Sequence, residues 1–297
     1  SYSTITQVDL EVGDEVKSWD CGCPFRAPGH RKTPTRDPFM TLRHYFSLVD
    51  MQARMALQSE ASRYYFGYLW WILEPLLFVA GFYVVFSVIL KTRQEDFLVF
   101  LMCGKLPFVW FSKSVSQASN SMMANPGLIG RIDVPKTMFP MAVIQEGLYK
   151  QSTVFLLLFA VLIIYGYNPS IVWLWLIPIL AVYYVMIVAC SFLGAVLVCF
   201  MQDFSLLISL GMVFLMCTSG IVWDVRDLAD PLMTDVILTF NPMAFILDAF
   251  REVLMYGNAP DLLGLAGNAA VFGSLAFIMI RFIRKHSEFL ALKVLTA

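Results

Sequence analysis

Six ionisable residues lie within or beside long apolar stretches of the chain, where a charge is costly unless it has a partner or lines a polar path. Glu146 and Lys150 are four residues apart, so one helix face carries both and we predict that they pair. Two interpretations stand for Lys105: it lines a polar path or binds an anion, or it forms a structural ion pair or extends toward water. Interfacial or structural roles are favoured for the other three, which are Glu74, Lys113 and Asp203.

A dense aromatic cluster follows Arg63 and leads into an apolar run that continues to Leu90. Aromatic side chains with a polar end concentrate at membrane–water interfaces, and cations flank them on the cytoplasmic side. An interfacial belt therefore accounts for most of the cluster. Aromatic faces also stack on sugar rings, so a pore that conducts a glycan is the alternative. The candidates for channel or glycan contact are Tyr64, Tyr65, Phe66, Tyr68, Trp70, Trp71, Glu74, Lys105, Phe108, Trp110 and Phe111.

Membrane-spanning helices are the elements that would position these residues. The chain has 297 residues, of which 59% are hydrophobic and 14% charged, whereas soluble domains are about 25% charged. A spanning helix needs about 20 mostly apolar residues. We therefore predict an all-α polytopic membrane protein, and we expect Pro178 to tilt or kink its fourth span. The predicted spans are 72–90, 97–118, 141–165, 171–200, 204–222 and 262–283.

Lysine and arginine are concentrated in the segment before the first span, in the loop between the second and third spans, and after the last span. The loop 223–261 has two arginines against seven acids. Because cytoplasmic loops are rich in Lys and Arg, we predict that both termini are cytoplasmic.

The predicted spans lie in a transmembrane domain, residues 63–284, with three flanking segments. Residues 1–38 are polar and contain four prolines, so we expect an irregular cytoplasmic extension. Residues 39–62 carry apolar side chains at three-to-four-residue spacing, which predicts an amphipathic helix in the membrane interface. An ordinary helix packed on the extension is the alternative. Residues 285–297 are expected to be a cytoplasmic tail.

The outward loop, residues 223–261, is too apolar for a solvated loop and too interrupted for a span. Two short amphipathic helices separated at Asn241-Pro242 fit it best. Re-entry into the membrane would require that the backbone be buried in protein or line a cavity.

The loop 119–140 is the most informative cytoplasmic segment. Asn125-Pro126-Gly127 predicts a turn, and a short apolar face follows beside charged residues. Pro135 and Pro140 prevent a long helix. A short amphipathic helix held by turns would suit docking of a soluble partner, whereas a simple connector is the alternative.

Motifs for chemistry are missing. The sequence contains no G-x-x-x-x-G-K-[ST], no H-E-x-x-H and no G-x-S-x-G, so it predicts no nucleotide-binding loop and no catalytic site of these kinds. Cys21 and Cys23 have only His30 nearby, short of the roughly four ligands that a metal site needs. No metal site is predicted.

Five segments occur in a characteristic order over roughly residues 40–290. They are RYYFGYLWWILEPLL (63–77), GKLPFVWFSKSVSQASNSM (104–122), NPGLIGRIDVPKTMFP (125–140), SGIVWD (219–224) and NPMAFILDAFREVLMYGNAP (241–260). On these segments the chain resembles the membrane permease subunit of bacterial ABC-2-type polysaccharide exporters, which export O-antigen, capsular polysaccharide or teichoic acid.

The resemblance implies a transport subunit in the bacterial cytoplasmic membrane, without enzymatic activity of its own. Two copies would enclose a channel at their interface for a lipid-linked polysaccharide, and each would bind a separate ATPase subunit. ATP and Mg would bind to that partner, so this chain would hold no cofactor. The resemblance assigns ATPase coupling to Asn125, Pro126, Gly127, Leu128, Ile129, Gly130, Arg131, Ile132, Pro135 and Lys136.

Other functions are compatible with the same hydropathy. An ABC-2 exporter of drugs or simple lipids would move small amphiphiles. A membrane-embedded transferase, a channel or a scaffold protein would work without an ATPase partner. The transferase is disfavoured because no polar cluster of catalytic type occurs in the predicted spans.

Overall fold

The computed structural model describes residues 42–63, 65, 67–85, 96–131, 134–227 and 230–296. The chain divides into a unit of residues 1–40 and a unit of residues 41–297, and every described residue belongs to the second. Over the described ranges all regular structure is helical and no strand occurs, as the sequence predicted. The predicted N-terminal extension lies outside the described residues.

Four helices are long and apolar enough to cross a hydrocarbon core of about 30 Å. Pro140 and Pro178 each lie in the first turn of a helix, where no intrahelical N–H donor is needed. Each is the third residue of its α-helix, and neither proline breaks that helix. The four are α3 (Phe97–Asn120), α5 (Met138–Ile164), the 3-10 turn η3 (Ile171–Trp175) continued by α6 (Leu176–Phe200), and α10 (Leu262–Lys285).

Two of the six predicted spans are shorter than expected. The predicted span 72–90 is described as α2 (Trp70–Tyr83), preceded by the 3-10 turn η1 (Gly67–Leu69), and residues 86–90 lie outside the described residues. The predicted span 204–222 is α7 (Phe204–Thr218), which has 15 residues. It ends early because Gly220 takes a φ of +66°, which a helix cannot continue through. The described residues thus contain four full-length spans where six were predicted.

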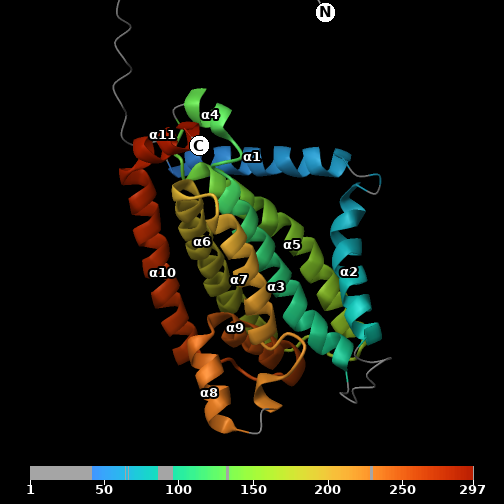
Figure 1. Ribbon diagram of the computed structural model, residues 1–297. Helices are drawn as coiled ribbons and strands as arrows, with labels where there is room; N and C mark the ends of the chain where they lie inside the picture. The colour runs from blue at the N-terminus through green and yellow to red at the C-terminus, as the bar shows by residue number, and fades with distance from the viewer. Residues whose placement is uncertain are drawn as a thin grey trace, which may run out of the picture. The chain divides into compact units, whose positions relative to one another are not determined.

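The core lies between α3, α5, α6 and α10 (Figure 1). α3 is the most enclosed span, and nearly all of its side chains from Phe97 to Phe111 are buried. Tyr183 of α6 is fully buried beside it and donates its hydroxyl to the carbonyl of Pro107, 2.7 Å away. This hydrogen bond satisfies the phenol O–H, which would otherwise lack a partner in the apolar interior.

α1 (Leu42–Arg63) lies across one end of the helices (Figure 1). Val49 and Ala53 of the predicted apolar face are buried, and Val49 packs against Met138 and Ala142 of α5. Phe46 of the same helix is 55% exposed.

Two short helices lie at the same end as α1. α4 (Pro126–Arg131) is the short helix predicted in the loop 119–140. Most of the predicted C-terminal tail forms α11 (Ser287–Thr296), which packs against α4 and α6. Leu290 and Val294 of α11 are buried, and they explain why the tail folds. We call this end of the molecule the α1 end.

The opposite end carries α8 (Pro231–Phe240) and α9 (Pro242–Arg251), with the turn η4 (Val225–Asp227) before them (Figure 1). The predicted break at Asn241 is confirmed. Asn241 caps α9 by accepting hydrogen bonds from the N–H groups of Met243 and Ala244, at 3.1 and 3.2 Å. α9 continues into the π-helical turn η5 (Glu252–Tyr256), and the chain bends by 106° between α8 and this continuous helix. We call this end the α8 end.

Candidate functional site

One face of α3 carries polar side chains through the middle of the molecule. Lys105, Ser112 and Ser116 lie on this face because their spacing fits the helical repeat. They line a cavity of about 490 Å³ between α2, α3 and α7. Met212 and Met216 of α7 form the opposite wall. We call this the α3–α7 cavity, and it is large enough for a drug-sized group.

Lys105 is a buried ammonium in the wall of that cavity, with 5% of its surface exposed. Its Nζ lies 3.0 Å from the sulfur of Met216 and 5.5 Å from the centre of the Phe108 ring. An aromatic face attracts a cation through its quadrupole. Lys105 therefore lines the α3–α7 cavity from within the protein.

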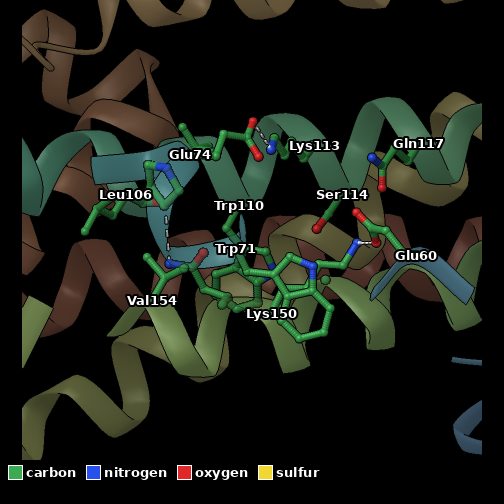
Figure 2. A pocket seen from close by; sticks show the side chains of 14 residues that line it. Glu60, Trp71, Glu74, Leu106, Trp110, Lys113, Ser114, Gln117, Lys150 and Val154 are labelled. Carbon is green, nitrogen blue, oxygen red and sulfur yellow. Dashed lines mark hydrogen bonds and ion pairs between the residues drawn. The ribbon is translucent and has the colours of Figure 1, made fainter. Parts of the chain in front are cut away.

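A second, smaller cavity of about 90 Å³ lies among α1, α2, α3 and α5. We call it the Trp110 cavity. Glu74 and Lys113 line both cavities and form an ion pair of 2.5 Å, which joins α2 to α3. Figure 2 shows this pair on one side of the Trp110 cavity and the pair of Glu60 with Lys150 on the other.

The predicted pair of Glu146 and Lys150 is confirmed, with 2.7 Å between Oε1 and Nζ. Lys150 also binds Glu60, which comes from the end of α1, and its Nζ lies 5.8 Å from the centre of the Trp71 ring. One lysine thus connects α1, α5 and the first turn of α2. The sequence pattern could find the partner within the helix but not Glu60, which is 90 residues away.

Asp50 and Tyr45 attach the middle of α1 to α5. The hydroxyl of Tyr149 donates to Asp50, and this hydrogen bond lowers the pKa of the Asp50 carboxyl. Arg54 binds the same carboxylate at 3.0 Å. Tyr45 donates to the hydroxyl of Thr137 at 3.2 Å, while burial raises the pKa of its phenol. Polar contacts as well as apolar packing therefore hold α1 in place.

The predicted aromatic candidates on α2 and α3 separate into two groups. Trp71 and Trp110 line the Trp110 cavity, and Phe108 lines the α3–α7 cavity. Phe111 is 4% exposed and stacks on Tyr183 with 6.3 Å between ring centres, so it packs in the core.

The described candidates that precede α2, and Trp70 at its first position, line neither cavity. Tyr65 is fully exposed and Tyr68 is 57% exposed. Tyr68 contacts Trp71 edge to face, and Trp70 is half-buried. Tyr64 and Phe66 lie outside the described residues. This group fits an interfacial belt better than a cavity wall.

α4 presents one apolar side chain outward and buries the next. Ile129 is 5% exposed, whereas Leu128 is 37% exposed. A Cβ on Gly130 would lie 3.2 Å from Leu295 of α11, so the two helices approach closely there. Lys136 donates to the carbonyl of Ile129 at 3.2 Å and fixes the chain that follows α4.

The other predicted coupling residues flank this contact. Pro126 and Gly127 are exposed, and Asn125 and Pro135 are half-buried. Ile132 lies outside the described residues. Sequence analysis did not predict α11, which has only 10 residues. Its buried face exists because the helix packs against α4 and α6.

Arg226 organises the α8 end. Its Nε and Nη2 donate to the two oxygens of Asp248 at 2.9 and 2.8 Å, and its Nη1 lies 2.7 Å from Glu252. These hydrogen bonds, first of all that to Asp248, raise the pKa of Arg226. The three residues line a cavity of about 1070 Å³ between α8, α9 and α10. Sequence analysis found only that acidic residues outnumber arginines in this loop, and it did not predict these ion pairs.

Arg251 is a second arginine of the α8 end that sequence reasoning did not single out. It is 2% exposed, its Nη2 donates to the carbonyl of Ile221 at 3.1 Å, and its guanidinium lies 3.6 Å from the centre of the Phe100 ring. Gly104 provides the space: a Cβ there would lie 2.5 Å from Nη2. The guanidinium thus fixes the end of α9 against α3.

Comparisons with known proteins point to one kind of transporter. No family model matches the chain. An O-antigen export system permease protein RfbA from Klebsiella pneumoniae is 31% identical over 218 residues, which cover 73% of this chain and 83% of the relative. The chain belongs to the family of O-antigen export permeases.

Two further relatives carry the same description. One from Klebsiella pneumoniae is 28% identical over 219 residues, covering 73% of this chain and 83% of the relative. One from Myxococcus xanthus is 22% identical over 237 residues, covering 77% and 88%. Membership confirms the resemblance to ABC-2-type export permeases. With its four long apolar helices, this family member is a multi-pass membrane protein and a transport subunit rather than an enzyme.

Proposed function

We propose that two copies of this permease form an ATP-driven exporter of a lipid-linked polysaccharide, of O-antigen or capsule type. The α3–α7 cavity carries this proposal. The half-exposed Glu74–Lys113 pair and two serines of α3 line this cavity. Polar groups at membrane depth are costly against lipid, so a second copy would have to cover the cavity. Covered in this way, the polar face of α3 would form part of a channel at the interface between the copies.

A separate ATPase subunit would dock at α4 and bind ATP and Mg. Two features of α4 favour this contact: Leu128 is exposed on it, and α11 packs against it. A ligand can move a gate only through different contacts with the gate's two states. In the proposal, α4 and α1 carry that difference from the ATPase to α3 and α5.

The proposed position in the membrane follows the distribution of Lys and Arg. The α1 end, with both termini, would face the bacterial cytoplasm, and the α8 end would face outward. α1 would lie in the membrane interface. α2 and α7 would complete six transmembrane segments around the four long ones.

The test is deletion of the gene and complementation in the source bacterium. We expect deletion to remove polysaccharide from the surface and to leave lipid-linked glycan inside, and we expect complementation to reverse both. Gels of surface and retained glycan measure the outcome. Unchanged surface glycan without internal accumulation would contradict the proposal, and efflux of small amphiphiles would then be measured instead.

A further inference from the structure

Two buried polar atoms of the Trp110 cavity lack a hydrogen-bond partner among the described residues. They are the indole Nε1 of Trp110 and the hydroxyl of Ser114. Trp110 is 4% exposed and Ser114 is 1% exposed, so neither group can turn toward bulk water. Buried polar groups are nearly always hydrogen-bonded, and those that are not call for an explanation.

Both atoms converge on Gly147 of α5. A Cβ at Gly147 would lie 2.6 Å from the Ser114 oxygen and 3.5 Å from the Trp110 nitrogen. The missing side chain therefore keeps open the space that the two atoms border.

The charges around the cavity are already balanced. Lys113 is paired with Glu74, and Lys150 is paired with Glu60 and Glu146. An anion would find each of these ammonium groups beside a carboxylate that repels it. A neutral polyhydroxyl group, in contrast, can donate to the carboxylates and accept from the Trp110 N–H. The Trp71 ring, in the same wall, offers an apolar surface.

The size of the cavity sets the size of the ligand. A buried water needs about 10–15 Å³, so the cavity of about 90 Å³ has room for roughly six to nine waters. That space is comparable to one sugar ring and is too small for a chain of them.

We propose that the Trp110 cavity binds a single neutral sugar ring within one copy of the permease. This inference rests on the proposed function, because the ring would belong to the exported glycan. The Glu74–Lys113 pair lines both cavities, and its side chains are about half-exposed, 47% and 49%. If the Glu74–Lys113 ion pair separates, the Trp110 cavity would open into the α3–α7 cavity. The sugar ring would then be released into the proposed channel.

The test measures binding of methyl glucoside, methyl galactoside and methyl mannoside to the full chain in lipid nanodiscs. Saturation-transfer NMR detects the bound ring and tryptophan fluorescence gives the affinity. Each of Ser114→Ala and Trp110→Phe removes one hydrogen bond, so we expect about three- to tenfold weaker binding. Gly147→Ala places a methyl group 2.6 Å from the Ser114 oxygen and 3.5 Å from the Trp110 nitrogen, so it should obstruct both hydrogen bonds and weaken binding more than either single variant.

Ser191→Ala is the matched control. Ser191 is also fully buried and its hydroxyl also lacks a partner among the described residues, but it lines neither cavity. We expect this variant to bind like the unmodified chain. Circular dichroism and gel filtration verify the fold, and if Gly147→Ala does not fold, the comparison of Ser114→Ala with Ser191→Ala decides.

Three outcomes would overturn the sugar site. The first is that no glycoside binds, and the second is that all variants bind glycoside with equal affinity. The third is that inorganic phosphate displaces the glycoside and that Ser114→Ala weakens the binding of phosphate. The gene deletion separates this inference from the proposed function. If deletion abolishes export while Ser114→Ala and Trp110→Phe bind glycoside normally, only the sugar site fails. If deletion leaves surface glycan unchanged, the proposed function fails whatever the binding data show.

Discussion

The two ends of the molecule each contain one cation held by two carboxylates, yet the two triads do different work. At the α1 end, Lys150 binds Glu60 and Glu146 and connects α1 to α5 across 90 residues of sequence. At the α8 end, Arg226 binds Asp248, 22 residues away, and Glu252. The first triad determines how distant helices meet, whereas the second secures a loop to the helix that follows it.

The surroundings of the triads differ as well. Beside Lys150 lie two buried donors, Trp110 Nε1 and Ser114 Oγ, without partners among the described residues. Arg226 uses three of its nitrogens on two carboxylates, a geometry in which a guanidinium is bound firmly. The charged cluster at the α8 end therefore uses its donors to stabilise the fold. The cluster at the α1 end lies beside two donors that the described residues leave free to bind a ligand.

Leu128→Asp should have the largest effect and should act on transport alone. The side chain is 37% exposed on α4, so a charge there should change the free energy of unfolding by no more than about 0.5 kcal/mol. If the ATPase docks there, export should fall at least about tenfold, equivalent to about 1.4 kcal/mol of lost coupling. Surface glycan and thermal unfolding of the purified chain measure the two effects.

The control for Leu128→Asp is Ile129→Asp on the same helix. Ile129 is 5% exposed, so burying a charge there should destabilise the fold as well as stop export. Normal export by Leu128→Asp at normal expression would remove α4 from the coupling mechanism.

Gly104→Ala should affect stability at the α8 end. The added Cβ would lie 2.5 Å from Nη2 of the buried Arg251, and overpacking of this kind costs about 1–3 kcal/mol. Unfolding in mixed detergent micelles measures the loss. Gly273→Ala in α10 is the matched control, because no atom lies within 4 Å of its added Cβ. Equal stability of both variants would show that Arg251 is not confined by α3.

Lys150→Met and Arg226→Met should both destabilise the chain. Lys150 is 22% exposed, and its removal leaves the partly buried Glu60 and Glu146 without a cation, at a cost of about 1–3 kcal/mol. Arg226 is itself 49% exposed, but its two carboxylate partners are only 12% and 10% exposed, so its loss should cost a comparable amount. A double-mutant cycle of Lys150→Met with Glu60→Gln should give a coupling of about 0.5–2 kcal/mol. A coupling near zero would mean that α1 is held by its apolar face alone.

The smallest effect should be a pH dependence of the docking of α1 on α5. The hydrogen bond from Tyr149 lowers the pKa of Asp50 below its ordinary value of 3.8. Its contribution to the docking of α1 is therefore fully present above about pH 4 and is lost as the pH falls through the folded-state pKa. A spin label at the exposed position Ser47 should become more mobile in that range. Asp50→Asn should remove this part of the pH dependence, and an unchanged profile would assign it to other carboxylates.

Much of the local structure followed from the sequence. The apolar runs predicted the four long helices, the spacing of Glu146 and Lys150 predicted their pair, and Asn241-Pro242 predicted the break between α8 and α9. Each of these is a relation between residues close in sequence. Hydropathy overestimated α7, because an apolar run continues past Gly220 although the helix ends at Thr218.

The sequence by itself determined that this chain is a helical membrane permease, since apolar length and short motifs are written directly in the residue order. Only the tertiary structure decided which of the candidates meet. Glu60 reaches Lys150, Ser114 and Trp110 converge on Gly147, and α11 supports α4. Helix periodicity gives the face on which a residue lies but not the helix that this face will meet. That choice depends on the packing of the whole core, to which every buried side chain contributes.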